Sequence, residues 1–114
     1  MTTHSPHPTV LILGANGRFG MAAAKAFDAA GWRVLAQVRR DAAAGMPVRA
    51  EVVRVPLDAV AAALAGRSGP ASLPSVVIHA VNPIYTRWEA EALPAARAAM
   101  GIAEALGARF LLPG

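Results

Sequence analysis

Short apolar runs alternate along the chain with longer segments in which apolar residues recur every three or four positions. A short apolar run that stops at a glycine or a charged residue is typical of a strand buried on both faces of a parallel sheet. A longer segment with helical spacing is typical of a helix packed on such a sheet. Five runs predict strands, at residues 9–13, 33–38, 51–55, 76–80 and 109–112.

The segment from Arg18 to Ala30 predicts the first helix. Its apolar residues recur at helical spacing, and Lys25 and Asp28 are expected to face outward. Gly31 then ends the helix, because glycine readily adopts the backbone conformation found just beyond helix ends. The apolar face is expected to consist of Phe19, Ala22, Ala23, Ala26, Phe27 and Ala30.

Two further helices are predicted in the second half of the chain. Residues 57–64 predict a short one that closes at Gly66. Pro94 suits the first turn of the last helix, where its missing N–H costs nothing, and that helix is expected to end at Gly107. Its packed face is expected to include Ala96, Met100 and Ala103.

This alternation of strands and helices predicts an α/β fold of the Rossmann type. Strands connected through helices pair in parallel with right-handed crossovers, which gives an open sheet of order 3-2-1-4-5 with helices on both faces. The ligand crevice of such a sheet lies at the carboxyl ends of the first and fourth strands. Residues 1–8 are expected to be a flexible tail and residues 9–114 a single domain.

Composition narrows the class of protein. Of the 114 residues, 55% are hydrophobic but only 5% are aromatic, so alanine and the aliphatic residues must fill the core. No apolar run approaches the roughly 18 residues needed to cross a bilayer, and the N-terminus lacks the pattern of a secretory signal. We therefore expect a cytoplasmic protein without a membrane partner, with which the absence of cysteine is compatible.

The net charge of +4 does not predict a nucleic-acid partner. The arginines are scattered, with Arg39 and Arg40 as the only adjacent pair, and scattered arginines are typical of a solvated surface. No metal site is expected either. The chain has no cysteine, and the prolines at 6 and 8 prevent a helix that would bring the side chains of His4 and His7 together.

A glycine-rich turn between the first strand and the first helix carries the strongest chemical signal. Gly14, Gly17 and Gly20 form a GxxGxxG pattern in the strand-to-helix context that makes such a motif meaningful. The first permits a tight turn, the second leaves room for a pyrophosphate, and the third lets the helix pack closely. The helix N-terminus adds unpaired N–H groups for the phosphates. A turn that uses glycine for its shape alone is the alternative. The turn residues predicted at the cofactor are Gly14, Asn16, Gly17, Arg18, Phe19 and Gly20.

The end of the second strand indicates which dinucleotide is bound. Preference for NAD normally rests on an Asp or Glu about 20 residues beyond the glycines, whereas this chain has QVRR at 37–40. A guanidinium at Arg39 would pair with the 2′-phosphate of NADP, and Arg18 could clamp that phosphate from the other side. One such contact gives roughly a 10- to 100-fold preference. We therefore expect NADP(H), with NAD(H) as second choice. The alternative is that Arg39 and Arg40 only solvate a loop.

Three segments carry a family resemblance: GANGRFG at 14–20, QVRR at 37–40 and VIHAVNPIYTRW at 77–88. In this order they resemble the NAD(P)-dependent epimerase/dehydratase group, the extended and atypical short-chain dehydrogenase/reductases. The likeness covers nearly the whole chain from Thr9 onward and implies that the loop after the fourth strand lines the cofactor crevice. By this resemblance Ala80, Val81 and Asn82 lie near the riboses of the dinucleotide.

The sequence departs from that family's pattern in three ways. Family members usually carry an acid for the adenine at the end of the third strand, where this chain has Val55-Pro56-Leu57 and Asp58 is the nearest acid. The family's catalytic tyrosine has a lysine four residues on, but Tyr85 has Glu89 there, so no catalytic residue is assigned. The substrate-binding part is also absent. The resemblance thus implies a truncated Rossmann domain: half of a larger enzyme, a truncated gene product or a stand-alone module.

Two kinds of function remain open. The first is an NADP(H)-binding domain of an epimerase/dehydratase-like oxidoreductase that acts on a nucleotide-sugar or another carbonyl or alcohol substrate. The second is a non-enzymatic module that senses the dinucleotide. An unpaired fifth strand would expose a sheet edge, so a homodimer through that edge or a helix face is a further hypothesis. His79 favours a hydrogen-bonded core histidine over a catalyst. For Tyr85, Arg87 and Trp88, a loop anchored by an aromatic is favoured over a substrate contact.

Overall fold

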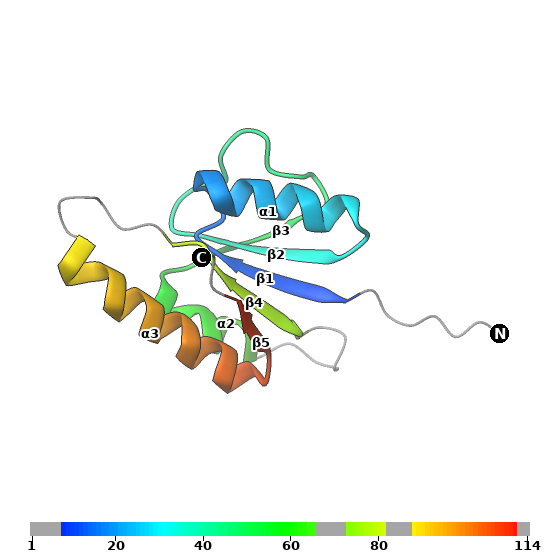
Figure 1. Ribbon diagram of the computed structural model, residues 1–114. Coiled ribbons are helices and arrows are strands. Elements are labelled where there is room, and N and C mark those ends of the chain that lie inside the picture. Colours follow the sequence, from blue (N-terminus) through cyan, green and yellow to red (C-terminus); the bar gives the residue numbers. More distant parts are fainter. Residues whose placement is uncertain (1–7, 66–72, 82–87, 112–114) are drawn as a thin grey trace.

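The computed structural model describes residues 8–65, 73–81 and 88–111. Five strands form one parallel sheet of order β3-β2-β1-β4-β5, which confirms the predicted Rossmann-type α/β fold (Figure 1). The strands are β1 (Thr9–Leu13), β2 (Arg33–Val38), β3 (Glu51–Arg54), β4 (Val76–His79) and β5 (Arg109–Leu111). The helices are α1 (Arg18–Ala29), the 3-10 turn η1 (Leu57–Ala59), α2 (Val60–Ala65) and α3 (Trp88–Leu106). None of the helices in the described ranges is long and apolar enough to cross a lipid bilayer.

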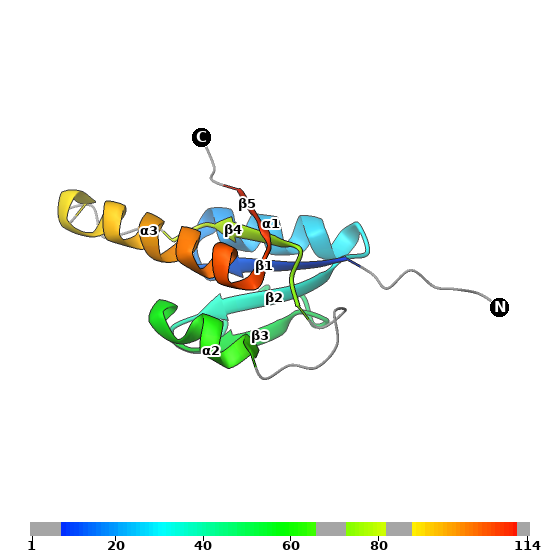
Figure 2. The same cartoon turned by 90° about the horizontal axis from the view of Figure 1, so that it is seen from below.

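Helices cover both faces of the sheet, as the alternating pattern predicts. Helix α1 lies on one face, and α2 and α3 lie on the other (Figures 1 and 2). Successive side chains of a strand point to opposite faces, so the central strand β1 supplies both cores. Val10 and Ile12 belong to the core under α1, whereas Leu11 and Leu13 belong to the core under α2 and α3. The carboxyl end of β1 is thereby fixed between two packed layers, and the glycine turn begins there.

The buried face of α1 differs from the predicted one. Ala23 is buried as expected, but Gly20 and Ala24 complete the face, and Phe19 is 50% exposed. Ala22, Ala26 and Ala30 are exposed as well. Alanines occur on several sides of this helix, so the spacing of apolar residues does not show which side is buried. Lys25 is exposed as predicted, whereas Asp28 is only partly exposed because it pairs with Arg49.

Helix α3 begins earlier than the sequence predicts. Pro94 lies inside the helix, which starts at Trp88, and not in its first turn. The intervening sequence EAEAL at 89–93 consists of strong helix formers, which favour a helix that starts before the proline. The predicted packed face is also partly wrong, because Met100 is 54% exposed. The buried residues of α3 are Ala99, Ile102 and Ala103.

His79 at the end of β4 is a buried core histidine. Its ring stacks on that of Phe110 in β5, with centroids 6.4 Å apart, and the residue is 7% exposed. The predicted hydrogen bond is not found for Nδ1, which has no partner among the described residues. Burial disfavours the charged imidazolium and lowers the pKa of His79 below its usual value.

This burial predicts a loss of stability in mild acid. The unfolded chain takes up a proton on a solvated imidazole near pH 6.5, before the folded protein does, so the free energy of unfolding should fall as the pH drops below that value. One proton gives a slope of at most about 1.4 kcal/mol per pH unit. Urea unfolding at pH 7.5 and 5.5 should show a smaller fall for His79→Gln than for the wild type. Equal falls in the two proteins would contradict the assignment.

Candidate functional site

A cavity of about 830 Å³ opens at the carboxyl edge of the sheet. It is bounded by the glycine turn after β1, the end of β2, residues 56–58, the end of β4 and residues of α3 between 94 and 98. This position, next to β1 and β4 where the strand order reverses, is where open α/β sheets bind ligands. Ligand pockets usually measure about 300–1,000 Å³, so the cavity is large enough for a cofactor.

The cavity brings together most of the residues predicted at the cofactor. Arg18 and Phe19 lie in the first turn of α1 without lining the cavity, as does Gly20. Asn82 lies outside the described residues. The predicted residues that line the cavity are Gly14, Asn16, Gly17, Arg39, Ala80 and Val81.

Two of the three glycines are required by the fold itself. Gly14 has φ +77°, a left-handed conformation that side chains disfavour, and a Cβ there would lie 2.8 Å from the Cα of Val81. At Gly20 a Cβ would lie 2.8 Å from the Cα of Ala15 and would overlap the carbonyl oxygen of Gly14. The turn and the first turn of α1 therefore touch backbone against backbone, as the glycine spacing predicts.

Gly17 is different, because no contact among the described residues requires a glycine there. A Cβ at this position would lie 3.5 Å from the oxygen of Gly14 and 3.9 Å from that of Ala80, which are ordinary contacts. Its backbone is extended (φ −72°, ψ 169°), a conformation open to any residue. Gly17 is exposed and lines the cavity. Close approach of a ligand would explain a glycine at a position where the fold does not.

The amino end of α1 presents free hydrogen-bond donors beside this glycine. The first hydrogen bond within the helix runs from the N–H of Met21 to the oxygen of Gly17 (2.8 Å), and no side chain caps this end. In the part of the chain that the structure describes, the N–H groups of Arg18, Phe19 and Gly20 therefore have no partner. Unpaired N–H groups and the helix dipole together favour a phosphate at this end.

Asn16 ties the glycine turn to the loop after β2. Its Nδ2 donates to the carbonyl oxygen of Asp41 (2.9 Å), and its Oδ1 accepts from the N–H of Ala43 (2.7 Å). The Asp41 carboxylate in turn pairs with the guanidinium of Arg54 in β3 (3.1 Å). Asn16 lines the cavity, but both ends of its amide are engaged within the protein. In this structure the Asn16 side chain holds the loop that begins with Arg39.

Arg39 and Arg40 bring positive charge to the cavity. Both line it and are exposed, and neither has an ion-pair partner among the described residues. Asp58 in η1 lines the same cavity. Asp41, the acid closest in sequence to the two arginines, does not line the cavity and pairs with Arg54. The rim next to β2 is therefore suited to an anionic group.

Gln37 lines the cavity but is not predicted to do so by the motif analysis. It is 1% exposed, its Oε1 accepts from the N–H of Gly14 (2.9 Å), and its Nε2 donates to the oxygen of Val55 (2.7 Å). The available signal is its polarity, since the rest of β2 from Val34 to Val38 is apolar. Ala95 and Ala98 of α3 were missed too, because they belong to none of the segments that predict the cofactor site.

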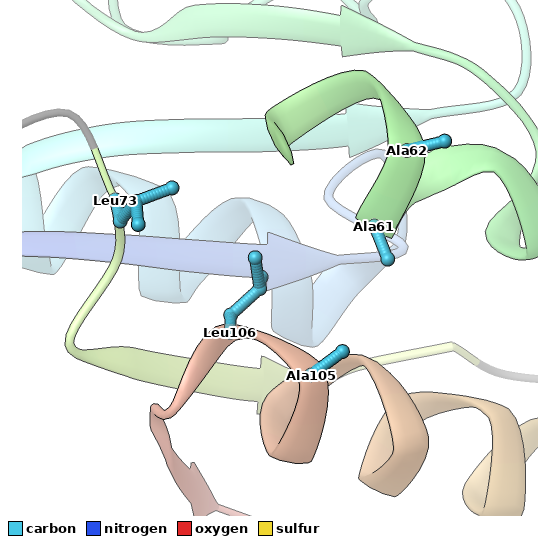
Figure 3. A pocket seen from close by; sticks show the side chains of 5 residues that line it. All are labelled: Ala61, Ala62, Leu73, Ala105 and Leu106. Atoms are coloured by element: carbon cyan, nitrogen blue, oxygen red, sulfur yellow. The ribbon is translucent and has the colours of Figure 1, made fainter. Parts of the chain in front are cut away.

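A second, smaller hollow of about 380 Å³ lies between α2 and the carboxyl end of α3. Figure 3 shows the side chains that line it, which are Ala61, Ala62, Leu73, Ala105 and Leu106. All five are aliphatic, so no side chain here can orient a polar ligand or transfer a proton. The hollow is not a candidate site for chemistry.

Comparison with known proteins supports the assignment of the fold. No protein-family model and no curated protein matches the sequence. A short-chain dehydrogenase/reductase superfamily protein from Agrobacterium tumefaciens, solved with bound NAD, matches with a TM-score of 0.64 and 24% identity over 91% of this chain and 31% of its own. An epimerase from Methanothermobacter thermautotrophicus matches with 0.71 and 19% over 93% and 34%. The enzyme WbmG from Bordetella bronchiseptica, in complex with NAD and UDP, matches with 0.70 and 16% over 93% and 37%.

This chain spans between 31% and 47% of the length of such solved proteins. The match extends over nearly the whole of the chain, which agrees with the extent of the resemblance predicted from its three sequence segments. In fold, the chain resembles part of the short-chain dehydrogenase/reductase superfamily protein and of the epimerase named above.

Proposed function

We propose that the chain binds NADP(H) in the 830 Å³ cavity, as the nucleotide-binding domain of an epimerase/dehydratase-like oxidoreductase. The observation that carries this proposal is Gly17, a glycine that the fold does not need, placed beside the free amino end of α1. Structures of similar fold contain NAD, and one of them also contains UDP. A nucleotide-sugar, or another carbonyl or alcohol compound, is the proposed substrate.

Different groups of residues around the cavity suit the diphosphate, the adenine and the riboses of a dinucleotide. The diphosphate would take the N–H groups at the start of α1 and lie against Gly17. The adenine would pack on the apolar surface of Pro56 and Leu57. Ala80 and Val81 at the end of β4 would border the riboses. When bound, the cofactor would supply the hydride chemistry, and this part of the chain would supply its binding and orientation.

The choice of NADP(H) over NAD(H) rests on Arg39. Its guanidinium lies at the cavity, has no partner among the described residues, and can hold a phosphate with two parallel hydrogen bonds. NAD selectivity would need a carboxylate for the 2′-hydroxyl at this place. Asp41, the acid nearest to Arg39 in sequence, is held by Asn16 through its backbone and by Arg54 through its side chain.

Dissociation constants for NADPH and NADH test the proposal, since both cofactors can be followed by their own fluorescence. The wild type should bind NADPH about 10- to 100-fold more tightly than NADH. Arg39→Gln should lose most of this preference by weakening NADPH, and it should leave NADH within about twofold. Arg109→Gln is the matched control. Arg109 begins β5, which lies three strands away from β2 in the sheet and does not line the cavity. Equal affinities of the wild type for the two cofactors would overturn the choice of NADP(H).

A further inference from the structure

Gln37 is a buried amide at the centre of the candidate site. Three hydrogen bonds meet at this residue: Oε1 accepts from Gly14 N (2.9 Å), Nε2 donates to Val55 O (2.7 Å), and the main-chain oxygen accepts from Ala15 N (2.9 Å). They join the turn after β1 to the ends of β2 and β3. The side-chain pair needs a neutral group that has both an acceptor and a donor, because one end must accept while the other donates.

The bond to Gly14 bears on the part of the turn that faces the cavity. Gly14 holds a left-handed conformation, and its carbonyl oxygen accepts from the N–H of Gly17 (3.2 Å). The orientation of the Gly14 residue therefore sets where Gly17 and the start of α1 lie. Without the amide of Gln37, the N–H of Gly14 and the carbonyl of Val55 would lose their partners, and both would be free to turn toward water.

We propose that Gln37 is a positioning residue of the dinucleotide site, which fixes the Gly14 backbone and through it the amides that hold the diphosphate. This inference rests on the proposed function and adds a residue that acts without being expected to touch the cofactor. A purely structural residue would affect stability alone. A positioning residue affects cofactor affinity in a way that follows the donor and acceptor character of its side chain.

Two substitutions of similar shape separate these roles. Gln37→Met removes both side-chain hydrogen bonds without adding charge, and it should weaken NADPH binding about 10-fold at every pH. Gln37→Glu restores both bonds only when the introduced carboxyl is protonated, because a carboxylate cannot donate to Val55. Its affinity for NADPH, relative to the wild type, should be about 10-fold lower at pH 8 and should approach the wild-type value near pH 5.5.

Dividing each dissociation constant by the wild-type value at the same pH removes the titration of other groups. The other titratable groups near the site are the 2′-phosphate and His79 on β4, and the charged residues that line the cavity are Arg39, Arg40 and Asp58. The control is Val34→Ala, at the far end of β2, which should lower the unfolding temperature without changing the dissociation constant.

The outcomes are distinct. If Gln37→Met binds NADPH as the wild type does, Gln37 has only a structural role and the inference is overturned, while the proposed function stands. If Gln37→Met does not fold, the pH series on Gln37→Glu decides, and an affinity ratio that stays constant between pH 8 and 5.5 overturns the inference. If the wild type binds neither NADPH nor NADH, the proposed function fails and takes this inference with it.

Discussion

Replacing Gly17 by valine is expected to weaken NADPH binding by about 100-fold or more, because the side chain would occupy the space where the diphosphate approaches the backbone. Two charge-assisted hydrogen bonds lost from the diphosphate are enough for an effect of this size. The fold should tolerate the change. Gly17 has an extended backbone, and a Cβ there makes only ordinary contacts with the oxygens of Gly14 and Ala80.

Titration of Gly17→Val with NADPH measures the loss of affinity, and thermal unfolding measures whether the fold tolerates the change. The unfolding temperature should fall by no more than about 8 °C, since valine is less favourable than glycine at a helix N-cap by about 1 kcal/mol. Gly17→Ala should fall between the two proteins in affinity. Gly101→Ala is the control, because Gly101 lies in α3 with open space around it. Wild-type affinity in a folded Gly17→Val protein would remove the pyrophosphate assignment.

Replacing Gly20 by alanine should have the opposite profile and destabilise the domain by about 3 kcal/mol. The added Cβ would overlap the carbonyl oxygen of Gly14 and approach the Cα of Ala15 to 2.8 Å. These are backbone atoms at the end of the central strand, so they cannot move aside as a flexible side chain could. The unfolding temperature should drop by more than about 10 °C.

Chemical denaturation of Gly20→Ala and Gly101→Ala gives a matched comparison within one type of substitution. Gly101→Ala should raise the free energy of unfolding by about 0.5–1 kcal/mol, because glycine is unfavourable inside a helix. A Gly20→Ala protein as stable as the wild type would show that α1 can move away from the turn. In that case the close contact seen here is not a requirement of the fold.

The strands and their order could be predicted from the sequence because their pattern is unambiguous. A strand such as β1, with five consecutive buried residues from Thr9 to Leu13, must lie in the middle of a covered sheet. The helix faces could not be predicted as well. Both α1 and α3 are rich in alanine, which is apolar wherever it stands, so the sequence did not indicate that Met100 is exposed and Ala99 buried. The start of α3 was missed because proline usually marks a first turn.

The site residues that belong to a sequence motif could be predicted. Those that reach the site only through packing of the folded chain could not. The glycine spacing and the arginines after β2 led to the residues that line the cavity. Gln37 is part of the QVRR segment, but its role was not predicted, because it depends on a distance of 2.9 Å to the nitrogen of Gly14 that only the folded chain reveals. Asn16 is predicted to contact the cofactor; it lines the cavity, and its amide holds the loop after β2, which the sequence did not indicate.

The two hydrogen bonds of the Asn16 amide also limit how the proposed preference for NADP(H) over NAD(H) could be changed by mutation. Because this amide joins the glycine turn to Asp41 and Ala43, the segment that carries the arginines and the segment proposed to face the diphosphate are held by the same side chain. Exchanging Arg39 alone would leave the neighbouring loop in the shape that suits its present sequence. A different loop after β2 would require a matching residue at position 16. The glycine turn and this loop should therefore be exchanged together.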